Sequence, residues 1–180
     1  NRVLLQAALL ESPDDAYLHY QLGKDWEAHD DFEQAVVHHA RALARLPPEG
    51  HAAPFRHDLV TRLLFCMKKL GQHAQALNLA EAELPYQGES PDFFFALGDL
   101  LLDWAAQEPV RADELLPMIE SSWLRCLEIG EAPQIEGAVL GRGSFLAAHN
   151  LAIYCQCLGQ TEAAQAYREQ ADRMRPSRRG

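Results

Sequence analysis

The chain has 180 residues, of which 48% are hydrophobic and 23% are charged, values that are typical of one soluble globular domain. The formal net charge of −10 argues against a surface that binds nucleic acid or an anionic membrane, because either would need a basic stripe, so a neutral or basic protein partner fits better. No apolar run reaches the roughly 20 residues that a membrane span requires, so membrane insertion is not expected.

Segments of helical periodicity separated by short turns follow one another along the chain, and no stretch alternates apolar with polar residues as a strand would. The first segment, 1–11, predicts one amphipathic helix. The sequence ESPD occurs at 11–14 and again at 89–92, which predicts helix N-caps at Ser12 and Ser90. The fold class expected from these patterns is all-α.

Short sequences return along the chain in one register, which indicates internal repeats. LGQHAQA at 70–76 returns as LGQTEAA at 158–164, and YQLGKDW at 20–26 returns more loosely as FALGDLL at 95–101. This pattern resembles the tetratricopeptide (TPR) repeat, a helical hairpin of 34 residues. The resemblance implies a single repeat domain over 1–180: a right-handed α-α superhelix, a TPR-like solenoid of about four helix pairs behind an N-terminal helix.

The register places the repeats and the residues that define them. The repeats are expected at 16–49, 57–88, 91–130 and 145–178, with an insertion around 105–118 in the third and a turn rich in Gly and Pro at 130–144. The repeat-defining residues are Leu22, Gly23, Trp26, Ala35, Ala42, Pro47, Gly71, Ala76, Leu97, Gly98, Leu151, Gly159, Ala164, Ala171 and Pro176. Gly23 is expected to let the first helix approach the second near Ala35, and Trp26 is expected in the core. Leu64 replaces the glycine in the second repeat, which predicts a wider crossing there.

In a solenoid of this kind the first helix of each pair lines a concave groove. The register gives the following candidates for peptide or partner binding: Tyr17, Tyr20, Lys24, Phe65, Lys68, Asp92, Phe95, Asp99, Asp103 and His149. Tyr20, Phe65 and Phe95 are expected as apolar anchors among charges. The alternative is that they pack against an extra helix or loop that fills the groove. Asp99 and Asp103, one turn apart, predict a solvated acidic face or a docking point for Lys or Arg.

No residue pattern predicts a catalytic residue, a cofactor or a metal site. The adjacent His38 and His39, with His19 across the first helix pair, diverge along their helix, so zinc is not expected. LGRGS at 140–144 lacks the P-loop lysine and predicts a turn with Ser144 as N-cap. The cysteines lack zinc-ribbon spacing and are expected as buried free thiols in a reducing, cytoplasmic compartment. They are Cys66, Cys126, Cys155 and Cys157.

Two longer stretches, 11–26 and 135–176, resemble the helical region that follows the catalytic domain in some bacterial family 2 glycosyltransferases. In the second stretch, an I-E-G turn and a Gly-Ser precede an H-N-L helix. The resemblance implies a non-catalytic repeat region that recognises an acceptor or partner or mediates self-association, with the nucleotide-sugar and metal bound elsewhere. The chain begins without methionine, as an excised internal fragment would. The alternative is a stand-alone scaffold or adaptor unrelated to sugar transfer.

Overall fold

The computed structural model describes residues 2–47 and 53–176, and all regular structure within these ranges is helical. The all-α prediction is therefore confirmed. The chain divides into two compact units, Asn1–Gly88 and Glu89–Gly180. The ends of the first and last expected repeats, at 48–49 and 177–178, lie outside the described residues.

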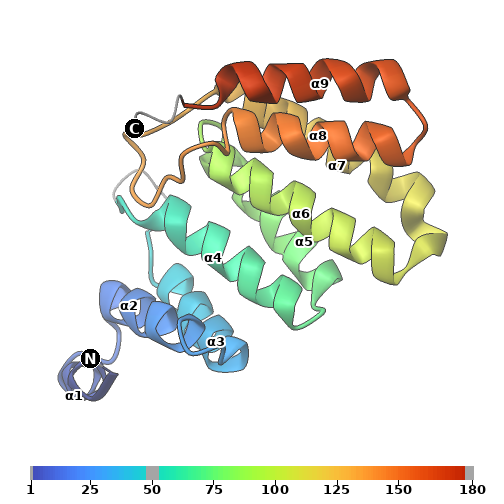
Figure 1. Cartoon of the computed structure of the whole chain (residues 1–180). Helices are drawn as coiled ribbons and strands as arrows, with labels where there is room; N and C mark the ends of the chain where they lie inside the picture. Colours follow the sequence, from blue (N-terminus) through green and yellow to red (C-terminus); the bar gives the residue numbers. More distant parts are fainter. Residues whose placement is uncertain (1, 48–52, 177–180) are drawn as a thin grey trace. The chain divides into compact units, whose positions relative to one another are not determined.

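In the first unit, α2 and α3 form one helical hairpin and α4 and α5 form another (Figure 1). The expected N-terminal helix is α1, which packs beside α2, and α3 packs beside α4. No residue of α1 is buried. The elements are α1 (Arg2–Glu11), α2 (Ala16–Glu27), α3 (Phe32–Ala44), α4 (Arg56–Lys69), α5 (His73–Glu83) and the 3₁₀ helix η2 (Leu84–Tyr86).

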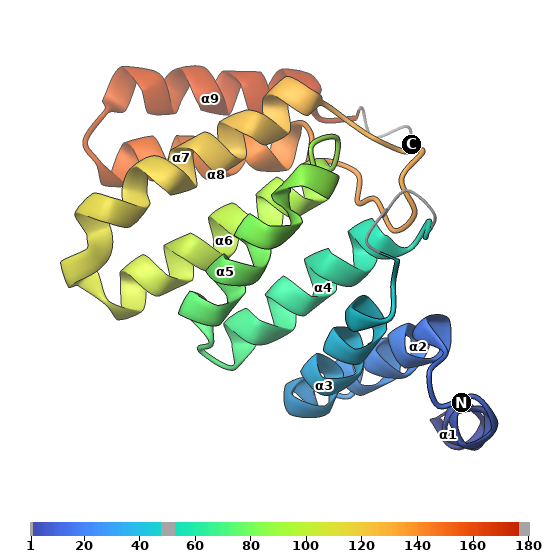
Figure 2. The ribbon, with the colours of Figure 1, turned by 180° about the vertical axis from the view of Figure 1, so that it is seen from behind.

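In the second unit, α6 pairs with α7 and α8 pairs with α9, and α7 also packs against α8 (Figure 2). The elements are α6 (Pro91–Gln107), the 3₁₀ helix η3 (Pro109–Arg111), α7 (Ala112–Ile129), α8 (Phe145–Cys157) and α9 (Thr161–Met174). The segment 130–144 between α7 and α8 contains no helix, as its Gly and Pro content predicts.

The expected insertion at 105–118 is helical, which differs from the loop that its sequence suggests. The helices α6 and α7 have 17 and 18 residues, whereas those of the first two hairpins have 11 to 14. α6 continues to Gln107, η3 makes the turn, and α7 begins at Ala112. The additional residues therefore lengthen both helices of this hairpin by roughly one turn.

Only one of the three predicted serine caps forms. Ser90 accepts a hydrogen bond from the amide three residues later at 3.2 Å, as predicted. Ser12 does not cap α2, because Asp15 takes that position and accepts from the amide three residues later at 2.9 Å. Ser144 precedes α8 but makes no capping bond, since its hydroxyl donates to the carboxylate of Glu131.

The repeated LGQ sequence makes the same turn twice. Gly71 and Gly159 have φ values of 67° and 73°, in the left-handed region that favours glycine. In both turns, the amide of the next residue donates to the carbonyl five residues earlier at 2.9 Å. Asp30 occupies the corresponding position of the first repeat with φ 59°, and the corresponding bond is 3.1 Å. The first repeat therefore keeps the turn without the glycine.

Gly23 allows a close approach of α2 and α3, but its partner is not Ala35. A Cβ at Gly23 would lie 2.5 Å from Nδ1 of His39, which lies one turn further along α3 and is fully buried. Gly98 plays the same part on α6, since a Cβ there would lie 2.5 Å from Nε1 of Trp123 on α7. A ring on the second helix fills the space left by the glycine in both hairpins. The α4–α5 hairpin, which lacks this glycine, has the least extensive contact of the four.

Trp26 is not a core residue as expected, because it stays partly exposed. The guanidinium of Arg2 lies 3.5 Å from the centre of its ring and covers it from the side of α1.

The repeat-defining prolines, Pro47 and Pro176, are exposed and Leu97 is partly exposed. The following repeat-defining residues are buried: Leu22, Gly23, Ala35, Ala42, Ala76, Gly98, Leu151, Ala164 and Ala171.

Replacing Gly23 by alanine should destabilise the first unit. The new methyl group must displace the His39 ring, and such overpacking costs about 1–3 kcal/mol, more than the roughly 1 kcal/mol that alanine gains over glycine in a helix. Gly88→Ala is the matched control, since nothing lies within 4 Å of a Cβ at Gly88. Urea unfolding followed by circular dichroism measures both variants. An unchanged midpoint for Gly23→Ala would contradict the close approach.

Candidate functional site

The predicted anchor Tyr20 is buried in the first unit. Its side chain is 1% exposed, its ring stacks on Phe55 with centroids 4.8 Å apart, and its hydroxyl donates to Asp58 at 2.5 Å. Phe55 comes from the segment just before α4 and covers the ring. Tyr20 therefore cannot anchor a partner: the anchor prediction is wrong for this residue, and the alternative, packing against another segment of the chain, holds.

Four other predicted groove residues of the first unit keep accessible surface. Tyr17 is 50% exposed, and Lys24, Phe65 and Lys68 are partly exposed. The ammonium groups of Lys68 and Lys69 lie 5.6 and 5.4 Å from the centre of the Phe65 ring. The two lysine side chains therefore lie within reach of a cation–π contact with this ring.

Asp92 is not a groove residue of the second unit. Its carboxylate is buried and accepts hydrogen bonds from the amide of Val139 at 3.1 Å and from the guanidinium of Arg142 at 2.7 Å. Asp92 therefore ties the segment 130–144 to the start of α6 and has no surface for steering a ligand. The guanidinium of Arg142 also lies 5.5 Å from the centre of the Phe95 ring, which is partly exposed.

A groove between α6 and α8 is the strongest candidate binding site of the second unit. It contains a cavity of about 230 Å³. The predicted Asp99 lies in its wall together with Ile153 of α8, and the predicted Asp103 lies one turn beyond Asp99 on α6. We call this site the α6/α8 groove, and its lining residues are Asp99, Leu102, Leu116, Trp123, Asn150, Ile153, Tyr154, Cys157 and Leu158.

The α6/α8 groove has a fixed floor and an exposed apolar rim. Trp123 and Tyr154 are buried beneath it with their rings edge to face, 6.5 Å apart, and the Tyr154 hydroxyl donates to the Leu116 carbonyl at 3.0 Å. Around the opening, Leu102, Ile153 and Leu158 are 41%, 47% and 43% exposed. Large apolar side chains exposed around an apolar hollow are typical of a surface that a partner covers.

On α8, the one predicted residue, His149, does not line the groove. The predicted His149 lies on the other side of the helix, in a hollow towards α9 that Arg168 and Asp172 also line. The residues of α8 that line the groove are Asn150, Ile153, Tyr154 and Cys157. Apolar residues occur all around α8, so the periodicity does not define which face is outermost.

A connected set of polar contacts lies inside the first unit. Arg62 on α4 donates to Asp58 at 2.6 Å and to Glu27 at 2.9 Å, and Glu27 in turn lies 3.5 Å from the buried ring of His39. Burial opposes the charge on Glu27, but the nearby His39 ring and the charge of Arg62 outweigh it, so the pKa of Glu27 is lowered. Burial also opposes the charge of Arg62, yet its two carboxylate partners raise its pKa. Together with the Tyr20 hydroxyl, this network joins α2, α3 and α4.

The chain is similar in structure to solved TPR proteins. It superposes on MamA, residue 41 to the end, from Desulfovibrio magneticus RS-1 with a TM-score of 0.72 and 14% identity, covering 99% of this chain and 86% of that one. For YrrB, "a TPR protein with an unusual peptide-binding site", the TM-score is 0.66 at 17% identity, covering 98% and 77%. For PilW, a type IV pilus biogenesis factor, it is 0.66 at 18% identity, covering 94% and 66%. The chain has the TPR fold.

This likeness is one of structure, because no protein-family model matches the chain and no curated protein is significantly similar to it in sequence. None of the described helices is both long enough and apolar enough to cross a membrane.

All four cysteines are free; Cys66, Cys126 and Cys155 are buried as expected, whereas Cys157 is exposed on the rim of the α6/α8 groove. Burial raises the pKa of the Cys66 and Cys126 thiols to about 12.

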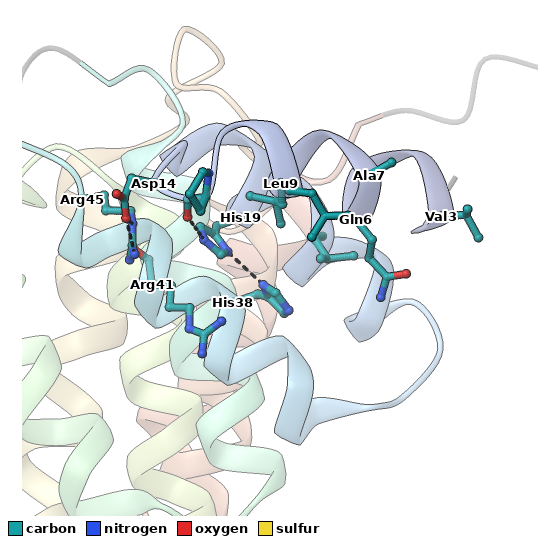
Figure 3. Close-up of a pocket in the computed structure, with 12 residues that line it drawn as sticks. Val3, Gln6, Ala7, Leu9, Asp14, His19, His38, Arg41 and Arg45 are labelled. Carbon is teal, nitrogen blue, oxygen red and sulfur yellow. Dashed lines mark hydrogen bonds and ion pairs between the residues drawn. The ribbon is translucent and has the colours of Figure 1, made fainter.

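A second cavity, of about 710 Å³, lies between α1 and the first TPR hairpin (Figure 3). The Nδ1 atoms of His19 and His38 lie 3.0 Å apart, and Nε2 of His19 lies 3.0 Å from the Pro13 carbonyl oxygen. The carbonyl can only accept, so with both rings uncharged His19 donates to Pro13 and accepts from His38. The residues that line the cavity are Val3, Gln6, Ala7, Leu9, Leu10, Pro13, Asp14, His19, Leu22, His38, Arg41 and Arg45.

The electrostatics of this cavity keep His38 uncharged at neutral pH. Burial and the neighbouring His19, Arg41 and His39 lower the pKa of His38 from its usual 6.5 to about 4. The ion pair between Arg45 and Asp14, 2.6 Å long, lies at one end of the cavity (Figure 3). His19 and His38 supply two ring nitrogens, fewer ligands than the three or four that a zinc ion needs from protein side chains.

The free energy of unfolding should fall as the pH decreases from about 6.5 to about 4. In this range the unfolded chain protonates His38 while the folded chain does not, so protons favour the unfolded state. His38→Gln should remove this part of the pH dependence, as melting temperatures at pH 7 and pH 4.5 would measure. His29→Gln is the control, because the His29 side chain is 64% exposed. Equal losses for wild type and His38→Gln would contradict the prediction.

Proposed function

We propose that the protein is a non-catalytic interaction module that binds a basic and apolar peptide segment of a partner in the α6/α8 groove. The observation that carries this proposal is the exposed apolar rim of the groove beside two carboxylates. Asp99 lines the cavity and Asp103 follows one turn later on α6. An apolar side chain of the peptide would enter the cavity, and neighbouring Lys or Arg side chains would pair with the carboxylates.

The size of the cavity favours a peptide side chain over a small-molecule substrate. Its volume of about 230 Å³ is below the range of about 300–1,000 Å³ that is usual for ligand sites. Its floor of Trp123 and Tyr154 is already formed, so binding requires little ordering of the protein. The TPR fold adds support, since a protein of the same fold, YrrB, is described as having a peptide-binding site.

Peptide binding should depend on both the charge and the shape of the groove. A fluorescein-labelled peptide of alternating Lys and Leu should bind, and its affinity should fall with added salt. Ile153→Arg should weaken binding at least tenfold, because the cation occupies the rim and repels the peptide. The double change Asp99→Asn and Asp103→Asn should weaken binding several-fold and flatten the salt dependence. Fluorescence anisotropy measures each effect.

Matched controls separate the groove from the rest of the surface. Val110→Arg places the same cation on a side chain of the second unit that is 91% exposed and outside the groove. Asp113→Asn removes an exposed carboxylate from the first turn of α7. Both should bind like wild type. Equal binding by a peptide of alternating Glu and Leu, or an equal loss in the controls, would contradict the proposal.

We also propose that this module is the repeat region of a longer bacterial family 2 glycosyltransferase, where it recognises an acceptor or partner or holds protomers together. The sequence resemblance of 11–26 and 135–176 supports this assignment, and the three buried free thiols support a reducing, cytoplasmic compartment. A stand-alone TPR scaffold, the alternative, accounts for the fold equally well.

Enzyme assays would separate the two assignments. Incubated with nucleotide-sugars and Mn²⁺, the 180-residue chain should release no nucleotide, because the donor and metal are bound elsewhere in that family. A longer protein that contains this chain should release nucleotide under the same conditions. A gene that joins this chain to an unrelated domain would contradict the glycosyltransferase assignment and leave the interaction module unaffected.

A further inference from the structure

Three metal-ligating side chains of different types meet inside the first unit. Glu27 is the last residue of α2, His39 lies in the middle of α3, and Cys66 lies near the end of α4. One ligand atom of each lies within 4.8 Å of the other two. The side chains of His39 and Cys66 are fully buried, and that of Glu27 is 17% exposed.

The polar atoms that face one another in this cluster have no hydrogen bonds. Among the described residues, neither ring nitrogen of His39 nor Oε2 of Glu27 has a hydrogen-bond partner. The distance between Nε2 and Oε2 is 3.5 Å, longer than the 2.7–3.2 Å that is usual for such a bond. Two ligands held at about 2.0–2.1 Å by a tetrahedral zinc ion lie roughly 3.3 Å apart. The observed separation is therefore close to that of two ligands of one ion.

The charges around the cluster favour a cation. The guanidinium of Arg62 forms ion pairs with two carboxylates, that of Asp58 at 2.6 Å and that of Glu27 at 2.9 Å. While His39 is uncharged, one positive charge faces two carboxylates, and the net negative charge of this partly buried group is unfavourable. A divalent cation would balance this charge together with that of a thiolate. Arg62 binds Oε1 of Glu27 and so holds Oε2 towards His39.

We propose that Glu27, His39 and Cys66 form a zinc site that links α2, α3 and α4. Carboxylate, imidazole and thiolate are all zinc ligands, whereas Mg²⁺ and Ca²⁺ select sites made of oxygen atoms. On binding, the S–H bond of Cys66 breaks, its proton passes to solvent, and the sulfur coordinates the metal. A water molecule completes the tetrahedron. The sulfur approaches the other ligands by at most about 1.3 Å, since zinc–sulfur bonds are about 2.3 Å long and place sulfur about 3.5 Å from the other ligand atoms.

Cobalt substitution tests the site directly. Metal-free protein titrated with Co²⁺ should develop thiolate-to-cobalt charge-transfer absorption that saturates at one equivalent and disappears when Zn²⁺ is added. Cys66→Ser should abolish this absorption, and Glu27→Gln should weaken cobalt binding at least tenfold. Cys126→Ser is the matched control, because Cys126 is equally buried but its Sγ contacts the carbonyl oxygens of Pro91 and Ser122. It should behave like wild type.

A measurement on the wild-type protein keeps the proposal testable if a variant does not fold. X-ray absorption of the zinc-loaded chain should show one sulfur at about 2.3 Å and nitrogen or oxygen ligands at about 2.0–2.1 Å. Zinc should also raise the melting temperature of the wild-type protein, because the ion binds only the folded cluster. Absence of stoichiometric binding, a zinc shell without sulfur, or equal losses in Cys66→Ser and Cys126→Ser would overturn the proposal.

Discussion

The contact between a glycine on one helix and a ring on the next determines how two of the hairpins pack. Gly23 receives the imidazole of His39, and Gly98 receives the indole of Trp123. Neither ring could take its place if the glycine carried a Cβ, because the atoms would come within 2.5 Å. Packing in protein interiors leaves few voids, so the position of such a ring also fixes what surrounds it.

Each ring connects its hairpin to a different candidate site. Trp123 packs edge to face with Tyr154 and forms the floor of the α6/α8 groove. His39 brings a polar ring into the interior of the first unit, where it meets Glu27 and, through Glu27, Arg62. The same contact therefore has different results in the two units. The indole beside Gly98 lies under an apolar hollow, and the imidazole beside Gly23 belongs to a polar cluster.

Ion pairs with limited access to solvent add specificity to the packing of the first unit. Arg56 at the start of α4 makes a bidentate pair with Glu83 at the end of α5, with distances of 2.9 and 2.8 Å, and both side chains are only 8% exposed. Such pairs contribute little net stability, but removing one partner leaves a buried charge uncompensated. They therefore favour one alignment of the two helices over alternatives of similar apolar burial.

The sequence predicted those features that depend on local chemistry. The helical periods, the left-handed glycines of the LGQ turns and the Ser90 cap each require only residues close together in the chain. It did not predict that Phe55 covers Tyr20 or that Asp92 binds the segment 130–144, because these contacts join residues 35 and 47 or more positions apart. The cluster of Glu27, His39 and Cys66 was missed for the same reason: its members come from three helices. On α8, apolar residues on all sides left the outer face undefined.

Only one of the four cysteines, Cys157, is exposed, so the folded protein has a single accessible thiol. Cys157 is exposed at the edge of the α6/α8 groove, whereas the other three thiols are enclosed. A thiol-directed reagent should therefore modify the folded chain at Cys157 first. A fluorophore attached there would sit beside the apolar rim and report a change in local polarity whenever the groove is covered, without any substitution in the protein. Cys157 is thus a natural labelling site for a fluorescence assay of binding in the groove.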